Sequence, residues 1–151
     1  MKTVIHYIGG SYLPITQTWI HEQIRSLKEY QPTVYALETR NLDMYPTERI
    51  RSLELKDGLG NLTTLLNKGW NKLFNFYPSC VFFFIEDRPG LVHAHFGPSG
   101  YSLLSFKRIF KFSLITSFYG YDLWRLPHQD SKWKSRYERL FEEGDGFLVE
   151  G

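Results

Sequence analysis

Polar and glycine residues follow three apolar runs of the sequence at the point where each run ends. They are Gly9-Gly10, His95 and the segment Tyr119–Asp122, which follow the runs 4–8, 91–94 and 113–118. Short runs rich in β-branched and aromatic residues, without polar alternation, are typical of strands buried in a parallel sheet. Because ligands bind beyond the carboxyl ends of such strands, we expect the three clusters to form one site.

Gly9 and Gly10 allow the backbone to turn tightly and approach a ligand, with amides free to bind an anion. An ordinary turn that ends a strand is the simpler interpretation of a bare pair of glycines. The segment 9–14 lacks the later glycines of the G-x-G-x-x-G dinucleotide fingerprint, and the sequence contains no P-loop. These absences argue against nicotinamide and nucleoside-triphosphate chemistry.

His93 and His95 stand two residues apart in an expected strand, so their side chains point to the same side of the sheet. We expect His93 to lie deeper as a hydrogen-bonded core residue, and His95 to meet a phosphate or sugar beside a helix that begins near Pro98. Paired histidines also bind zinc in hydrolases, but zinc needs a third and usually a fourth ligand. No motif places the other histidines with this pair, and we expect no bound metal.

Asp122 follows a Gly-Tyr pair at a strand end, where a carboxylate can orient or deprotonate a sugar hydroxyl. A turn aspartate that bonds its own backbone is an equally good interpretation. Two segments, 68–76 and 106–112, mix basic and aromatic residues, as surfaces that dock on anionic lipid headgroups do. We expect core packing to explain the apolar stripe of the first and the helix dipole to explain the cations of the second.

Strands and helices alternate along the chain and would position these residues. Strands are expected near 4–8, 33–37, 91–96, 113–118 and from 147, and helices over 18–31, 62–77, 98–110 and 131–141. Segment 41–60 is expected to be a loop with a short strand near 50–55, and segment 80–85 is either a strand or a helical turn. This alternation predicts a doubly wound parallel α/β sheet, with one Rossmann-like domain over residues 1–151.

Composition limits the classes of function. Eighteen basic and sixteen acidic residues give a net charge of +2, which is too small to argue for a nucleic-acid partner. Cys80 is the only cysteine, which excludes a disulfide framework and suits a reducing cytoplasm. No segment is long and apolar enough to span a bilayer. We expect a cytoplasmic protein, soluble or peripheral at the inner face of the plasma membrane.

Three ordered segments closely resemble the N-terminal domain of family 4 glycosyltransferases, and in particular the colanic-acid and amylovoran exopolysaccharide type. They are Val92–Gly100, Ile115–Asp122 and Tyr137–Val149, and the helix segment 18–24 is similar as well. The resemblance covers nearly the whole chain, with residues 41–85 the least diagnostic part.

The resemblance implies a GT-B fold, in which two Rossmann-like domains face a cleft. It implies retaining transfer of a hexose from a UDP- or GDP-sugar to a lipid-linked saccharide at the bacterial inner membrane, without a metal or other cofactor. It assigns substrate binding to Gly9, Gly10, Tyr119 and Gly120, and catalysis to His95 and Asp122. Tyr119 stands where the family usually has histidine, and tyrosine carries a proton less readily.

Residues 1–151 match the acceptor-side domain alone, so we expect transfer to require a separate donor-binding domain or chain. Stabilising the departing diphosphate is the main electrostatic task of such a transfer, and the family assigns it to the donor-binding half. Two alternatives remain open. The first is a non-catalytic module that binds saccharides or lipid headgroups, and the second, more distant, is a metal hydrolase that uses His93 and His95.

Overall fold

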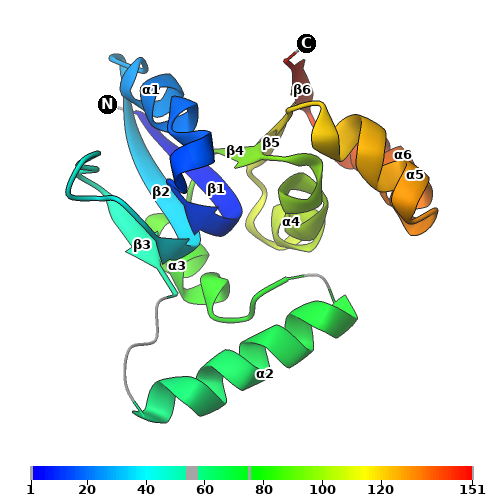
Figure 1. Cartoon of the computed structure of the whole chain (residues 1–151), viewed down its shortest axis with the longest axis horizontal. Coiled ribbons are helices and arrows are strands. Elements are labelled where there is room, and N and C mark those ends of the chain that lie inside the picture. The colour runs from blue at the N-terminus through cyan, green and yellow to red at the C-terminus, as the bar shows by residue number, and fades with distance from the viewer. Residues whose placement is uncertain (1, 54–57, 75, 151) are drawn as a thin grey trace.

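A computed structural model describes residues 2–53, 58–74 and 76–150. Six parallel strands form one sheet in the order β3-β2-β1-β4-β5-β6, with helices on both faces (Figure 1). The strands are β1 (Lys2–Tyr12), β2 (Tyr30–Thr39), β3 (Ile50–Ser52), β4 (Leu91–His95), β5 (Ser113–Phe118) and β6 (Gly146–Val149). The sheet confirms the doubly wound, Rossmann-like α/β class that the sequence predicts.

The helices are α1 (Trp19–Arg25), α2 (Gly58–Phe74), α3 (Cys80–Asp87), α4 (Gly97–Phe110), α5 (Leu126–Gln129) and α6 (Lys132–Glu143). A 3-10 turn (Ile15–Gln17) precedes α1, and a π-helical turn (Tyr121–Arg125) precedes α5. Within the described ranges, no helix combines the length and the apolar character needed to cross a membrane.

Successive residues of β1 alternate between two hydrophobic cores. Ile5 and Tyr7 pack in the larger core with α3, α4 and α6, whereas Ile8 and Tyr12 pack with α1 on the opposite face. The α1 core extends over β2 and reaches the start of β3, but it contains no residue of β5 or β6. On the α1 face, the apolar packing therefore stops short of β5, next to the strand that carries His93 and His95.

Two boundaries in the first half of the chain differ from the sequence prediction. β1 does not end at Gly9-Gly10 but continues to Tyr12, and its pairing with β2 shifts register between Ile8 and Ser11. An irregular step of this kind accommodates glycines inside a strand. Pro32 does not end a helix, because α1 ends at Arg25 and Pro32 lies within β2.

Other boundaries follow the local sequence. The short strand expected near 50–55 is β3, and its last predicted residues, 54 and 55, lie outside the described residues. The ambiguous segment from Cys80 forms helix α3. Ser131 occupies the position before α6 but its side chain makes no capping bond. Instead, the Asp130 carboxylate accepts the Lys132 amide at 3.0 Å.

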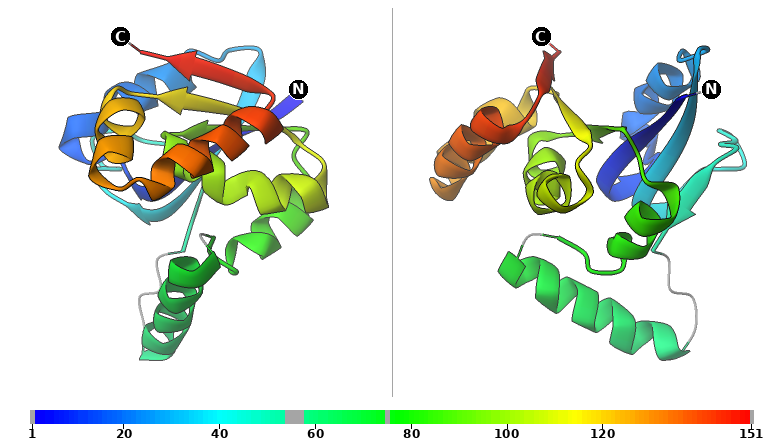
Figure 2. Two further views of the ribbon diagram at one scale, coloured as in Figure 1. Left: turned by 90° about the vertical axis from the view of Figure 1, so that its right-hand side faces the viewer. Right: turned by 180° about the vertical axis from the view of Figure 1, so that it is seen from behind.

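Helix α2 lies apart from the sheet in every view (Figures 1 and 2). The expectation that its apolar stripe packs in the core is wrong, because Leu65 and Leu73 are 67% and 74% exposed. Asn67 of α2 is buried, and its side chain bonds both the hydroxyl and the amide of Ser79, while the Trp70 ring lies 6.2 Å from the Phe76 ring. The stripe predicted the helix correctly but not the direction in which it faces.

Candidate functional site

The three predicted clusters meet at one edge of the sheet, because β1, β4 and β5 are neighbours. The Gly9 amide donates a hydrogen bond to the Ser99 hydroxyl of α4 at 3.1 Å. His95 at the end of β4 places its Nδ1 atom 2.7 Å from the Tyr119 hydroxyl after β5. The strand order therefore brings Gly9, His95 and Tyr119 around the start of α4.

Asp122 connects the start of α4 to the segment that follows β5. Its two carboxylate oxygens accept the backbone amides of Gly97 and Tyr119 at 2.7 and 2.8 Å, and the Tyr137 hydroxyl donates to its carbonyl at 2.9 Å. The side chain is buried, and Gly120 supplies the positive φ of 77° that the turn requires. These are the contacts of a positioning aspartate, and its catalytic role stays a prediction.

Phe96 forms a strained elbow between β4 and α4. Its φ of 75° is unfavourable for a bulky residue, and a hydrogen bond from its amide to the Ser117 carbonyl at 2.9 Å holds it. The ring lies against Trp19 and Tyr119, with centroids 6.5 and 4.8 Å away. Strain of this kind concentrates at functional sites. No local sequence signal marks it, because the conformation depends on the partner strand.

A third histidine joins the predicted pair. The Nδ1 atom of His6 in β1 lies 3.0 Å from the Nε2 atom of His95, and the His6 and His93 ring centroids are 5.2 Å apart. The expected depths are reversed: His95 is fully buried, whereas His93 is only partly buried and bonds the Ser117 hydroxyl at 2.7 Å. Tyr119 closes over His95, while the sheet face beside His93 stays open.

Burial keeps all three imidazoles neutral at pH 7. It lowers the pKa of His6 to about 3 and that of His93 to about 4. The pKa of His95 is held well below its usual range, first by burial and then by repulsion from the other two rings when they are charged. Burial also raises the pKa of Tyr119, so its phenol stays protonated and can donate.

A directional chain of hydrogen bonds leaves this cluster. Gln23 Nε2 donates to the Glu150 carboxylate at 2.9 Å, so its Oε1 atom faces the Tyr119 hydroxyl at 3.3 Å. Tyr119 then donates to Gln23 and accepts from His95 Nδ1, and His95 Nε2 accepts from His6. The remaining His6 nitrogen, Nε2, is buried with no hydrogen-bond partner in the described part of the chain.

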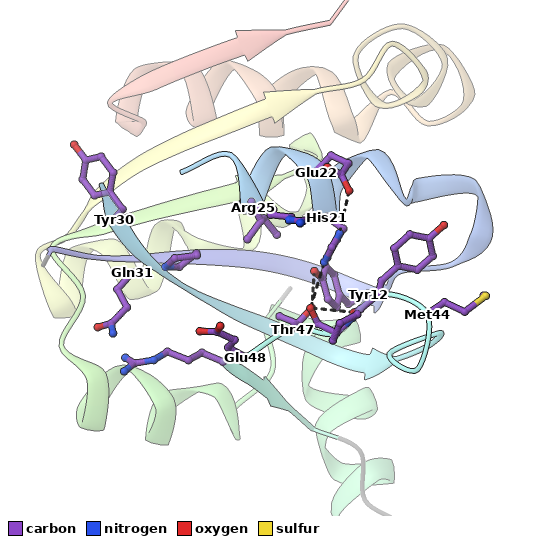
Figure 3. A pocket seen from close by; sticks show the side chains of 14 residues that line it. Tyr12, His21, Glu22, Arg25, Tyr30, Gln31, Met44, Thr47 and Glu48 are labelled. Carbon is purple, nitrogen blue, oxygen red and sulfur yellow. Dashed lines mark hydrogen bonds and ion pairs between the residues drawn. The ribbon is translucent and has the colours of Figure 1, made fainter. Parts of the chain in front are cut away.

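Two hollows lie near this edge. A cavity of about 260 Å³ is bounded by His6, His93, Tyr119 and Glu150, among others. A larger pocket of about 570 Å³ lies between α1, β2 and the connection to β3, and contains none of the predicted site residues (Figure 3). Tyrosine rings, including that of Tyr30, line it together with the charged and amide groups of Glu22, Arg25, Gln31 and Glu48. Sequence reasoning missed it because much of it comes from the irregular segment 41–49.

Comparisons with known proteins support the fold. No protein-family model and no curated protein matches the sequence. A Listeria monocytogenes protein assigned as a UDP-N-acetylglucosamine 2-epimerase is similar in structure, with 14% identity, a TM-score of 0.59, and coverage of 98% of this chain and 39% of that one. Another UDP-N-acetylglucosamine 2-epimerase gives 11% identity, a TM-score of 0.53, and coverage of 98% and 42%.

These likenesses define the class of fold, a Rossmann-like α/β domain of the GT-B-like type. The chain spans about two fifths of the length of either epimerase. The comparisons support the Rossmann-like α/β domain that the sequence resemblance implies for residues 1–151. They do not support the specific colanic-acid and amylovoran type.

Proposed function

We propose that this chain is the acceptor-side domain of a nucleotide-sugar glycosyltransferase that transfers a hexose from a UDP- or GDP-sugar to a lipid-linked saccharide. The main support is the meeting of Gly9-Gly10, His95 and the Tyr119–Asp122 turn beside the strained Phe96. The fold likeness to UDP-N-acetylglucosamine 2-epimerases adds that such a sheet edge suits nucleotide sugars.

The geometry suggests how the roles divide. Gly10 has open space where a side chain would stand, so a donor diphosphate can approach its backbone closely, whereas the Gly9 amide already bonds Ser99. His95 has no exposed surface, so it acts on a ligand through Tyr119, whose hydroxyl it orients. When a ligand binds, the Tyr119 phenol turns its hydrogen from Gln23 Oε1 to a sugar or phosphate oxygen.

The pocket of Figure 3 is the candidate acceptor surface. Saccharides are bound by tyrosine rings together with charged and amide groups, and this pocket offers both kinds. His21 and Tyr12 anchor its wall through contacts to Pro46 at 3.4 Å and Thr47 at 3.2 Å. The wall is thus fixed to α1 and β1, which also border the strand-end cluster.

Binding of nucleotide sugars tests the proposal on this chain directly. Titration of UDP- and GDP-sugars, followed by amide NMR, should shift Gly9, Gly10 and His95. Gly10→Ala should weaken this binding without loss of stability, because nothing lies within 4 Å of the new Cβ. Gly90→Ala is the matched control, since its Cβ also meets open space but lies before β4, at the opposite edge of the sheet. Shifts confined to residues 70–84, or equal weakening by both variants, would contradict the placement.

A lipid surface is the second candidate partner, and α2 is the observation that favours it. Its outward face carries exposed apolar side chains at helical spacing: Leu62, Leu65, Leu66 and Leu73. An amphipathic helix of this kind can insert its apolar face at a membrane surface, close to a lipid-linked acceptor. The other basic segment does not favour lipid, because Lys107 and Arg108 pair with Asp145 and Glu143 of the protein itself.

A further inference from the structure

We propose that His6, His93 and His95 form a binding site for one divalent transition metal ion of the zinc class. Each ring offers a nitrogen that lies within 4.8 Å of those of the other two. The sequence argued against a metal because the pair of histidines in β4 had no third partner. Strand β1 supplies that partner, since His6 is paired with His93 in the sheet register. This site goes beyond the proposed transfer reaction, which needs no metal.

The spacing requires a small adjustment when the metal binds. With zinc–nitrogen bonds of about 2.0–2.1 Å, tetrahedral ligand atoms lie about 3.4 Å apart. His6 Nδ1 and His95 Nε2, now 3.0 Å apart, must separate slightly, and the His93 ring must move toward them. His93 has the freedom to do so, because it is only partly buried and faces a cavity.

The surroundings are those of a supported ligand set. A ligating histidine commonly bonds a protein group through its other ring nitrogen, which fixes its orientation. His95 does this with Tyr119 at 2.7 Å, and His93 does it with Ser117 at 2.7 Å. Three neutral imidazoles without a carboxylate in the cluster favour zinc, copper, nickel or cobalt over magnesium or calcium.

A fourth coordination position would open on the cavity of about 260 Å³ that His6 and His93 border. Three protein ligands with one open position are typical of zinc sites that bind water or a substrate oxygen.

The test is metal binding by tag-free protein. Cobalt(II) should bind with one equivalent per chain, give the visible absorption of a four-coordinate site, and be displaced by zinc. His6→Asn and His93→Asn should each weaken cobalt binding by more than about tenfold. Loss of a residue that only hydrogen-bonds a metal ligand already lowers affinity by about 10- to 100-fold, and these variants remove a ligand itself. His128→Asn, an exposed histidine on α5, is the matched control and should bind normally.

Circular dichroism establishes that each variant is folded. If His6→Asn fails to fold, His93→Asn still decides, because its ring is only partly buried. Absence of stoichiometric cobalt, or cobalt binding that survives in His93→Asn, overturns the site. Neither result touches the nucleotide-sugar titration, so the two proposals fail separately.

Discussion

The Nδ1 atom of His6 lies 3.0 Å from the Nε2 atom of His95, although 89 residues separate the two histidines in the sequence. The contact exists because β1 and β4 are adjacent and parallel, with Ile8 opposite His95. It links the centre of β1 to the edge where Tyr119 and the elbow at Phe96 lie. A substitution of either histidine should therefore alter the structure around Tyr119 and Phe96.

The histidine cluster should make stability depend on pH. The unfolded chain takes up protons near the ordinary histidine pKa of 6.5, whereas the folded His6 and His93 resist protonation down to about 3 and 4. The contribution is therefore fully present above pH 6.5 and is lost as the pH falls toward 4. Each unit of depression corresponds to about 1.4 kcal/mol, so we expect the free energy of unfolding to fall by several kcal/mol.

Urea unfolding at a series of pH values measures this effect. Carboxylates also take up protons in acid, so the informative quantity is the difference between wild type and a variant. His93→Asn should lose less stability between pH 6.5 and 4 than the wild type does. His128→Asn should follow the wild-type curve, and equal slopes for His93→Asn and the wild type would show that the cluster is not the cause.

Tyr119 should hold His95 in place. Tyr119→Phe removes the hydroxyl between His95 Nδ1 and Gln23 Oε1 and leaves a buried imidazole nitrogen without a partner. We expect a loss of about 1–3 kcal/mol in urea unfolding at pH 7. In the presence of cobalt, the same change should lower metal affinity about 10- to 100-fold. Gln23→Ala, which leaves the His95 contact intact, should affect both quantities less.

Substitution of Asp122 should mainly lower the free energy of unfolding. Asp122→Ala removes both acceptors of the Gly97 and Tyr119 amides, and hydrogen bonds to a charged group contribute about 1.5–3 kcal/mol each. Asp122→Asn keeps a single acceptor oxygen, so its loss should be about half as large. Unfolding curves and the amide shifts of Gly97 and Tyr119 provide the measurement. An Asn variant as stable as the wild type would contradict the positioning role.

The fold and the place of each strand along the chain could be predicted because their signals are local. Apolar runs define the strands, and Gly97-Pro98 marks the start of α4. The direction in which the apolar side of α2 faces has no such local signal. A stripe of leucines shows that one side of a helix is apolar, but not whether protein or something else covers it. Here Asn67 and Ser79 decide the matter through contacts that no periodicity reveals.

The candidate site was predicted in part for the same reason. Gly9 lies near the carboxyl end of β1, His95 ends β4 and Asp122 follows β5, and parallel strands bring such positions to one edge. His6 lies in the middle of an apolar run and carries no signal of its own. Its place beside His95 follows from which strands pair and in which register, and a single sequence does not state either.

The exposed face of α2 should bind anionic membranes. Leu65→Glu with Leu73→Glu replaces two side chains that are 67% and 74% exposed, so the fold should tolerate the change. Burying a leucine contributes about 1.5–3 kcal/mol, so losing two should weaken vesicle binding by at least about tenfold. Ile109→Glu is the matched control, because Ile109 on α4 is 71% exposed but lies outside this face. Co-sedimentation with vesicles of phosphatidylglycerol and phosphatidylcholine measures the difference. Wild-type protein that stays in the supernatant, or an equal loss in Ile109→Glu, would assign the face to a partner other than lipid.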